Sequence, residues 1–375
     1  MLYTNCIYFS GEGRFVSGSF RVENGRFAPL AAAADGEERT DLGGATVIPG
    51  LVDCHTHGNS GEDASDGSYE GLCTMARWLA AQGVTAFAPT SMTLPYEQLA
   101  AAFDAARRLR DNAPRGCARM GGVHMEGPFF SDRKKGAQNG AYLKNPDFAA
   151  FRRLYEDCDG IIAIVDVAPE TPGAADFARE ASRLCRVSVA HTDADYEEAS
   201  RVFDAGASHV THLYNAMPGI HHRKPGVIGA ASERCDVRAE IICDGQHVHE
   251  SAVRMAFRLF PGRICLISDA GRCTGMPEGE YEQGGLTVLL KNHLARLPDG
   301  TIASSASSLY DCLLKAVSFG IPREEAVLAA TRRPAEELGL ADELGSIRPG
   351  LRADFVVCDA SLNRRAVYMD GERLC

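Results

Sequence analysis

The sequence predicts an α/β protein, in which a TIM (β/α)8 barrel is joined to a small β-sandwich domain built from both chain termini. Three observations lead to this fold class. From Thr46 onward, buried apolar runs alternate with amphipathic helices, as is typical of parallel strands joined by crossover helices. Eight such runs can be counted, which is the number of strands in a TIM barrel. The two ends of the chain instead show short strands and turns without a helical pattern.

The barrel elements are predicted from hydrophobic periodicity. In the first helix, Leu72, Met75, Ala76 and Leu79 are spaced by three and four residues and therefore share one face. The eight predicted strands are Thr46–Asp53, Val84–Thr90, Gly121–Met125, Ile161–Val167, Arg186–Ala190, His209–His212, Arg238–Cys243 and Arg263–Ser268.

After the eighth strand, Gly275–Ile302 is expected to be an insertion of turns and short strands. Helices over Ser308–Phe319 and Arg323–Thr331 are expected to follow it. We expect three segments in the chain: the first part of the small β domain at 1–45, the barrel at 46–340, and the second part of the β domain at 341–375.

Composition narrows the classes of function. The net charge of −11 argues against a nucleic-acid or anionic-membrane surface, because repulsion would oppose the approach. No apolar run is long enough to span a bilayer and the amino terminus does not resemble a signal peptide, so we expect a cytoplasmic protein. Thirteen scattered cysteines without a Cys-x-x-Cys pair predict reduced thiols, and we expect Cys54 and Cys273 to have packing roles.

Histidines and carboxylates stand at the ends of most predicted strands. Side chains at the carboxyl ends of TIM-barrel strands face one mouth, and such a set is hard to explain as packing. The set consists of His55 and His57 after strand one, His124 and Glu126 after strand three, His191 after strand five, His212 after strand six, Asp244 and His247 after strand seven, and Asp269 after strand eight.

Imidazoles and carboxylates together favour a divalent metal. A catalytic metal needs about three protein ligands and one open position, and Glu126, His191 and His212 would supply the ligands. His55 and His57 would point the same way from an extended strand. Two histidines that only cap a strand are the alternative explanation for that pair.

Five motifs along the chain form a recognisable set: Pro49–His57, His124–Phe129, Thr211–Pro218, Asp244–Val248 and Ser268–Ala270. Together they resemble the amidohydrolase superfamily and, within it, the N-acetylglucosamine-6-phosphate deacetylase family. The resemblance extends over nearly the whole chain. The last four motifs are specific to that family in combination, whereas the His-x-His of the first is shared by many relatives.

The resemblance implies metal-dependent hydrolysis of the acetamide of N-acetylglucosamine 6-phosphate in amino-sugar catabolism, by a homodimer. It implies that Glu126, His191 and His212 hold the principal ion, zinc or iron. His55 and His57 would hold a second ion, and because some relatives replace this pair, one or two ions per chain are both compatible with the sequence. Hydantoinase-like relatives have a carboxylated lysine after strand four, and the absence of a lysine from Asp166–Glu170 counts against ring opening.

Asp269 is the predicted general acid/base, which would take a proton from water and deliver it to the departing amine. A helix cap after strand eight is the alternative role for this residue. His247 is expected to hydrogen-bond the sugar or the acyl oxygen, with a plain surface role as its alternative.

The resemblance places Asn215, Ala216 and Arg223 at the phosphate, with Arg223 reaching a neighbouring subunit's site; a solvated basic loop is the alternative. Arg133, Lys134, Lys135 and Lys224 are interpreted as solvated charges. The substrate pocket is further expected to include Ala137, Gln138, Ala303, Ser304 and Ser305. Two of these depart from the family pattern: Gln138 replaces a histidine found in some members, and Ser304 replaces a usual glycine.

Three other functions remain as alternatives. The substrate could be another N-acetyl hexosamine phosphate, such as the galacto isomer, or an N-acyl amino acid. A catalytically silent amidohydrolase-like scaffold is the non-enzymatic alternative, and it predicts missing metal ligands. None of the expected ligands is missing from the sequence.

Overall fold

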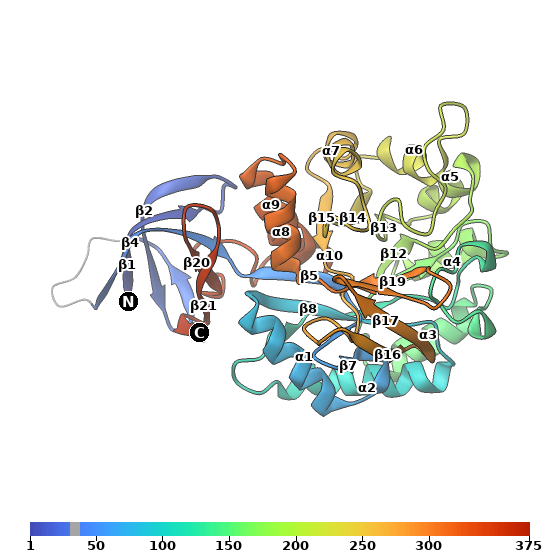
Figure 1. Cartoon of the computed structure of the whole chain (residues 1–375), viewed down its shortest axis with the longest axis horizontal. Coiled ribbons are helices and arrows are strands. Elements are labelled where there is room, and N and C mark those ends of the chain that lie inside the picture. Colours follow the sequence, from blue (N-terminus) through green and yellow to red (C-terminus); the bar gives the residue numbers. More distant parts are fainter. Residues whose placement is uncertain (31–37) are drawn as a thin grey trace.

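The computed structural model describes residues 1–30 and 38–375. Figure 1 shows a β-sheet unit that holds both chain termini beside a larger unit in which helices surround a parallel sheet. The predicted TIM barrel is confirmed, because eight parallel strands follow one another around the sheet in chain order. They are β5 (Leu51–Thr56), β8 (Val84–Ser91), β10 (Val123–Met125), β11 (Ile162–Val167), β12 (Arg186–Val189), β13 (His209–Val210), β14 (Arg238–Ile242) and β15 (Ile264–Ile267).

The first and last barrel strands, β5 and β15, are joined near their carboxyl ends. The Asp269 N–H donates to the carbonyl oxygen of His55 at 3.0 Å. Below it, the buried carboxylate of Asp53 accepts bonds from the amide and the hydroxyl of Ser268 at 3.2 and 2.6 Å. These bonds place two candidate site residues from opposite ends of the barrel sequence side by side.

The helices pack on the barrel through apolar stripes. In α1, the four residues predicted to share a face, Leu72, Met75, Ala76 and Leu79, are all buried. Helix α8 begins with a capping box on Ser308, close to the predicted start. The helices are α1 (Tyr69–Ala81), α2 (Tyr96–Asn112), α3 (Phe148–Asp157), α4 (Ala174–Ala181), α5 (Tyr196–Asp204), α6 (Gly226–Ser232), α7 (Glu250–Leu259), α8 (Leu309–Ser318), α9 (Arg323–Ala330) and α10 (Arg332–Glu337), with 3-10 turns η1 (Ala64–Asp66), η2 (Asp132–Lys134) and η3 (Gly140–Tyr142).

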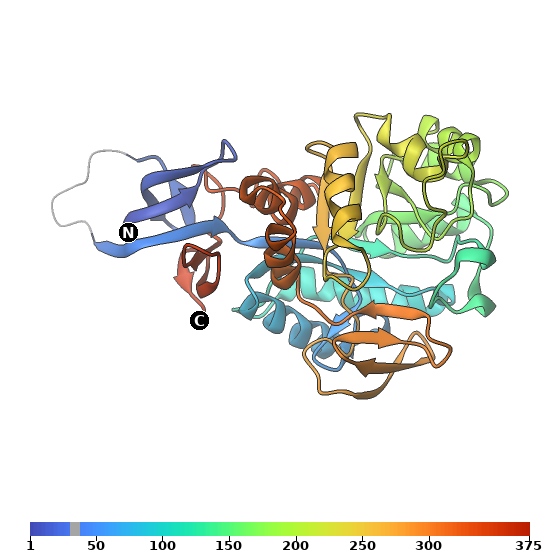
Figure 2. The same cartoon turned by 45° about the horizontal axis from the view of Figure 1, so that its top comes forward.

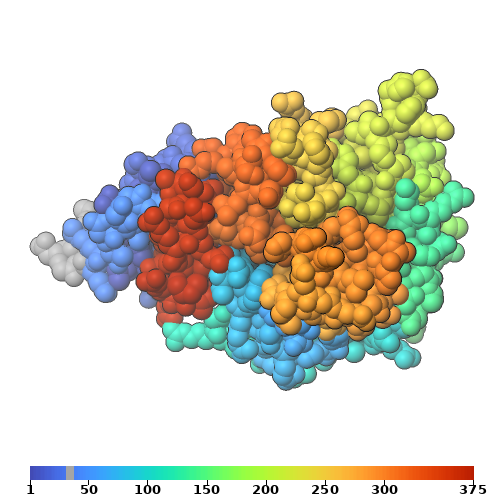
Figure 3. Space-filling view, viewed as in Figure 1, coloured from blue at the N-terminus to red at the C-terminus, as the bar shows by residue number. Residues whose placement is uncertain are grey.

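The predicted insertion after the eighth strand is a four-stranded antiparallel sheet. In the space-filling view it is the orange segment that covers part of the visible face of the barrel (Figure 3). Its last strand is tied to the barrel, because the Ser305 N–H donates to the carbonyl oxygen of Asp269 at 2.8 Å. The strands are β16 (Gly279–Gln283), β17 (Leu286–Lys291), β18 (Leu294–Arg296) and β19 (Ile302–Ser305); β6 (Gly58–Asn59), β7 (Glu62–Asp63) and β9 (Arg119–Met120) are short additions near the barrel.

The two ends of the chain form one seven-stranded sheet that curls around an aromatic core. Phe27 and Phe355 lie four strands apart, which is roughly 19 Å in a flat sheet, yet their ring centroids are 6.1 Å apart. The two halves of the sheet therefore face each other like the layers of a sandwich. In spatial order the strands are β22 (Glu372–Arg373), β21 (Arg364–Met369), β20 (Phe355–Cys358), β4 (Arg39–Pro49), β1 (Leu2–Phe9), β2 (Phe15–Glu23) and β3 (Arg26–Ala28).

The first predicted barrel strand, Thr46–Asp53, is wrong at its start. Its first four residues belong to β4, which pairs antiparallel with β20 of the terminal sheet and leads toward the barrel (Figure 2). The chain passes from β4 to β5 at Gly50, where a Cβ atom would lie 2.2 Å from Thr85 Oγ1. Hydrophobic periodicity cannot detect this change of sheet, because the residues on both sides of Gly50 are buried.

The segment limits 1–45, 46–340 and 341–375 stay a prediction. Strand β4 runs through the first limit and ends at Pro49. We therefore propose that the first segment extends to Pro49, so that it contributes all of β1 to β4 to the terminal sheet.

The thirteen cysteines, all within the described residues, are free thiols, in agreement with the sequence. Cys54 and Cys273 are buried in apolar clusters, as expected for packing residues, and the Cys54 thiol also donates to Glu240 Oε1 at 3.7 Å. In the part of the chain that the structure describes, no helix has the length and apolar character required to cross a membrane.

Candidate active site and metal centre

Most of the predicted site residues meet in a cavity of 310 Å³ at the carboxyl ends of the barrel strands. The walls come from the loops after these strands and from the start of β19 in the insertion. The lining residues are His57, Met92, Glu126, Arg133, Lys134, Gly136, Ala137, Gln138, His191, His212, Asn215, Ala216, His247, Asp269, Thr301, Ile302 and Ala303.

Glu126, His191 and His212 form a compact donor set in this cavity. Glu126 Oε1 lies 3.1 Å from His191 Nε2 and 3.0 Å from His212 Nε2, and the two nitrogens are 3.1 Å apart. Bonds of about 2.0–2.1 Å to zinc place neighbouring ligands of a tetrahedron roughly 3.3 Å apart. The three atoms therefore fit around one divalent ion, with a fourth position left for water or substrate.

A second donor set lies at the other oxygen of the same carboxylate. His57 Nε2 is 3.2 Å from Glu126 Oε2 and 3.4 Å from His55 Nε2. Asp269 Oδ1 completes this set, at 3.5 Å from His55 Nε2 and 3.3 Å from His57 Nε2. Glu126 thus has a donor set beside each oxygen and could serve as a ligand shared by two ions.

Hydrogen bonds behind the rings aim the histidines at the cavity. The Nδ1 atom of His191 lies 2.9 Å from the Lys134 carbonyl oxygen, and that of His57 lies 3.2 Å from the Thr90 carbonyl oxygen. A carbonyl oxygen can only accept, so Nδ1 must carry the proton. In the neutral ring, Nε2 then presents its lone pair to the donor set.

Three donor residues of the site occupy a backbone conformation that side chains rarely adopt. His191, His212 and Asp269 each lie two residues beyond the end of a barrel strand and have φ angles of 43°, 31° and 46°. A non-glycine residue with positive φ is strained, and such strain is typically concentrated at functional sites. The recurrence after β12, β13 and β15 indicates that this turn brings the side chains together over the barrel mouth.

The charges of the site are strongly coupled. Burial alone would raise the pKa of Glu126, but His57, His191 and His212 hold it well below its usual range. Burial likewise raises the pKa of Asp269, and this is outweighed by His55 and His57, which lower it. Burial lowers the pKa of His212, but Glu126 raises it to about 9. Two buried carboxylate anions thus lie among imidazoles in this site. A divalent cation can bind in such an environment in place of the protons on the imidazoles.

The predicted substrate residues Ala137, Gln138, Asn215, Ala216, His247 and Ala303 line the cavity. Gln138 also supports the metal centre, since its Nε2 donates to Glu126 Oε2 at 2.7 Å and its Oε1 accepts from the Thr93 N–H at 2.7 Å. His247 Nδ1 lies 2.7 Å from Asp244 Oδ2, so this predicted strand-end carboxylate orients the ring.

The structure does not bring Ser304, Ser305 or Arg223 into this cavity. Ser304 Oγ bonds Gln283 Oε1 at 3.2 Å beneath Gly271, because alternation along β19 turns it away from the face that carries Ala303. Ser305 is buried where β19 meets the barrel. Arg223 is exposed on the projecting loop before α6, where it bonds His222 at 2.6 Å (Figure 1).

Two further strand-end histidines lie behind the cavity. His55 has no exposed surface, although its Nε2 reaches the second donor set. His124 is equally buried in the barrel interior, where its Nε2 lies 2.9 Å from Asp166 Oδ1. The residue His124 therefore supports the barrel core and does not face the cavity.

Sequence reasoning missed Met92, Arg133, Lys134, Gly136, Thr301 and Ile302 as lining residues. Two of them are cations that the sequence suggests are solvated. Arg133 lies 3.4 Å from Asp193, whereas Lys134 forms no ion pair with any acid in residues 1–30 and 38–375. Their position four and five residues before Gln138 was the available signal, because the whole turn forms one wall of the cavity.

Comparison with known proteins agrees with this geometry. The amidohydrolase family matches residues 46–270 and 289–373. The chain belongs to the amidohydrolase family. N-acetylglucosamine-6-phosphate deacetylase of Vibrio furnissii is 34% identical over 358 residues, which cover 93% of this chain and 88% of that protein. N-acetylgalactosamine-6-phosphate deacetylase of Escherichia coli O157:H7 is 32% identical over 337 residues, 89% of each chain.

Solved structures give the same family and confirm the resemblance predicted from the motifs. A mutant N-acetyl-D-glucosamine-6-phosphate deacetylase from Mycobacterium smegmatis, in complex with N-acetyl-D-glucosamine-6-phosphate, superimposes with a TM-score of 0.92 at 31% identity. The match covers 100% of this chain and 99% of that one. The barrel and the terminal β unit are therefore both features of this group of amidohydrolases.

Replacement of Glu126 should remove every bound metal ion, whereas replacement of the His-x-His pair should not. In Glu126→Gln the shared ligand loses its charge, so metal content measured by atomic spectroscopy should fall to near zero together with activity. The double variant His55→Ala/His57→Ala retains the first donor set and should keep one ion per chain. Normal metal content in Glu126→Gln would contradict the shared-ligand geometry.

Proposed function

We propose that this protein is a metal-dependent deacetylase that converts N-acetylglucosamine 6-phosphate to glucosamine 6-phosphate and acetate. The observation that carries the proposal is the metal donor set of Glu126, His191 and His212 beside Asp269, in a chain of this family. The relatives named above act on phosphorylated N-acetyl hexosamines. We propose zinc or iron as the metal, with one or two ions per chain.

The protein's own groups support amide hydrolysis. A divalent ion on Glu126, His191 and His212 would polarise the acetamide carbonyl and acidify a water molecule. Asp269 is held as an anion, so it can accept a proton from that water as the water oxygen attacks the carbonyl carbon. Asp269 then returns the proton to the nitrogen as the C–N bond breaks, which leaves acetate and an amine.

The cavity also offers contacts for a phosphate. Lys134 and Arg133 bring positive charge to its lining, and Asn215 and Ala216 lie on the opposite loop, after β13. In a homodimer, which we propose as the active assembly, the exposed Arg223 could reach the cavity of the partner subunit. Arg223 is exposed and does not line the cavity of its own chain, which is compatible with that role.

The galacto isomer is the second candidate substrate, because one of the relatives is named for it. The N-acyl amino acid alternative receives no specific support, since the relatives named above are all named for hexosamine phosphates. A silent scaffold is disfavoured because all three ligands of the first donor set converge. We further propose a role in cytoplasmic amino-sugar catabolism, which suits a phosphosugar substrate.

The decisive experiment is acetate release from a panel of substrates by the purified, metal-analysed protein. We expect activity on N-acetylglucosamine 6-phosphate or its galacto isomer to exceed that on the unphosphorylated sugars by about tenfold or more, since each charge-assisted phosphate contact contributes on the order of 1.5–3 kcal/mol. An N-acetyl amino acid serves as the negative control. If no phosphosugar releases acetate, the proposed function is wrong.

The role of Asp269 can be separated from metal binding. Asp269→Asn keeps the shape of the side chain but cannot accept the proton, so turnover should fall by about a hundredfold or more. The variant should retain the ion of the Glu126, His191 and His212 set, as checked by metal analysis. Near-normal turnover in a metal-loaded variant would remove Asp269 from the mechanism.

Two neighbouring lysines provide a matched test of phosphate recognition. Lys134→Ala should raise KM for the phosphosugar by about tenfold through loss of one charge-assisted contact. Lys135→Ala is the control, because Lys135 pairs with Asp132 at 2.7 Å and does not line the cavity. Arg223→Ala should raise the same KM only if the protein is a dimer in solution. Equal effects of the two lysine substitutions would contradict the assignment of Lys134.

A further inference from the structure

Glu240 is a carboxylate buried inside the barrel, directly behind the cavity. It lies on β14, its side chain has no exposed surface, and it does not line the cavity. A buried carboxylate is costly unless it is paired and hydrogen-bonded. Its partners should therefore show what it does.

One oxygen of Glu240 joins the two metal donor sets. Glu240 Oε2 lies 2.9 Å from His55 Nδ1 and accepts a bond from the backbone N–H of His212 at 3.2 Å. His55 belongs to the second donor set and His212 to the first. The bond to His212 also anchors the backbone of a residue in a strained conformation.

The contact with Glu240 determines how His55 is presented. A carboxylate accepts from Nδ1–H, so the lone pair of the neutral ring lies on Nε2. That atom is 3.4 Å from His57 Nε2 and 3.5 Å from Asp269 Oδ1. Without Glu240 the ring could adopt the other tautomer, which has no lone pair on the side of the donor set.

We propose that Glu240 is a positioning residue of the metal centre: it holds His55 as a ligand for a second divalent ion and links that ligand to His212 of the first. The proposal rests on the proposed metal-dependent function. It adds a carboxylate that does not touch substrate or metal but determines whether the His-x-His pair can bind an ion.

The negative charge of Glu240 is balanced by a chain of ion pairs that leads away from the cavity. Glu240 Oε1 lies 3.1 Å from His209 Nε2, and His209 Nδ1 lies 2.7 Å from Glu337 Oε2. Burial lowers the pKa of His209, but the two flanking carboxylates raise it to about 10, so the ring is a cation. Glu337 in turn pairs with Arg186 and Arg238 at 3.2 and 3.1 Å.

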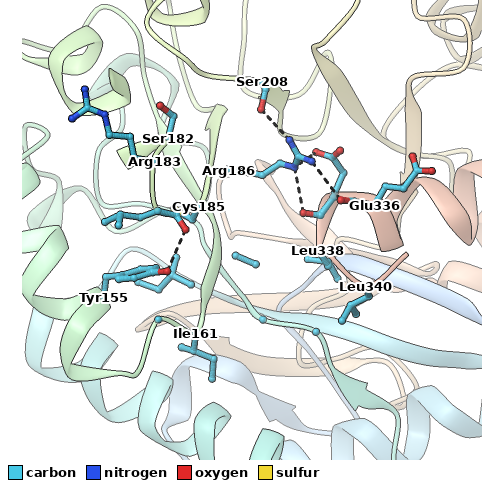
Figure 4. A pocket seen from close by; sticks show the side chains of 18 of the residues that line it. Tyr155, Ile161, Ser182, Arg183, Cys185, Arg186, Ser208, Glu336, Leu338 and Leu340 are labelled. Carbon is cyan, nitrogen blue, oxygen red and sulfur yellow. Dashed lines mark hydrogen bonds and ion pairs between the residues drawn. The ribbon is translucent and has the colours of Figure 1, made fainter. Parts of the chain in front are cut away.

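The chain of charges ends in a hollow of 670 Å³ at the amino ends of the barrel strands. Figure 4 shows Arg186 in this hollow, bonded to Ser208 and to the segment that contains Glu336. The other cations that line it are also paired, Arg183 with Glu180 and Arg110 with Asp159. The hollow therefore serves here as the solvent-facing end of the balancing chain, and we assign no ligand to it.

A third metal among His55, His124 and Glu240 is disfavoured, although their donor atoms lie close together. His55 Nδ1 is already bonded to Glu240 at 2.9 Å. The two ring nitrogens of His124 bond the Cys54 carbonyl oxygen at 3.2 Å and Asp166 at 2.9 Å. Hydrogen bonds occupy the donor atoms that such an ion would require, which leaves support of His55 as the role of Glu240.

The test is a zinc titration of the full-length protein after removal of its metal by a chelator, with ions bound per chain as the readout. Glu240→Gln removes the charge, and its amide cannot accept bonds from His55, His209 and His212 together. We expect its affinity for the second ion to fall by about 10–100-fold, the usual effect of losing a supporting partner of a metal ligand. The first ion should be retained.

Asp166→Asn is the matched control. Asp166 is also a fully buried carboxylate of the barrel interior, and it bonds His124 and Thr211 but none of the six side chains of the two donor sets. This variant should bind both ions as the wild type does. Melting temperatures of both variants, measured without metal, show whether each one folds.

Three results would overturn the proposal: a wild-type protein that binds one ion per chain, an unchanged second affinity in Glu240→Gln, or an equal loss of the second ion in Asp166→Asn. Selective loss of the second ion in Glu240→Gln alone would support it. Because the readout is metal binding, it remains informative if the substrate panel shows no acetate release, and the two proposals can fail separately.

Discussion

The carboxylate of Glu126 is the contact on which the rest of the site depends. The carboxylate is buried, with His191 and His212 about 3 Å from Oε1 and His57 3.2 Å from Oε2. A lone anion in this position would be strongly destabilising, so the histidines around it are needed for the charge as well as for the metal. Gln138 adds a neutral donor to the same carboxylate. One residue thus links the two proposed donor sets, the charge balance of the site and the lining of the cavity.

The barrel supplies this carboxylate with partners from strands that are distant in sequence. The parallel strands end at one mouth, and a repeated left-handed turn after β12, β13 and β15 brings His191, His212 and Asp269 together. Behind the mouth, Glu240, His209 and Glu337 carry alternating charge through the interior. The interior of a TIM barrel is usually filled by branched apolar side chains. The charged side chains inside this barrel can be explained because they support the highly charged site at its mouth.

Chemistry and recognition come from different parts of the structure. The groups proposed for hydrolysis stand on the ends of rigid strands, where their geometry is well determined. The groups proposed for phosphate binding lie on loops, including the turn with Lys134 and the exposed loop with Arg223. Loops can change without disturbing the barrel, and this division is consistent with relatives that act on different hexosamine phosphates.

The sequence by itself was sufficient to predict the barrel, the terminal β unit, and the convergence of Glu126, His191 and His212 at one mouth. The reason is physical: eight buried parallel strands must place their carboxyl ends at one mouth, so polar residues at those ends can be predicted to meet. The same reasoning placed Asp269 and the His-x-His pair at the mouth, and these residues do join the donor sets.

Only the tertiary structure decided which neighbouring residues face the cavity and which support it. The change of sheet at Gly50, the inward turn of Ser304 and the position of Lys134 depend on packing between segments far apart in the chain. The same holds for the role of Glu240. The sequence around it predicts only a buried strand, and its partner His55 lies 185 residues away in the chain. The hydrophobic pattern of a segment shows which face of a strand or helix is buried. Contacts between strands on different sides of a barrel form only when the sheet closes.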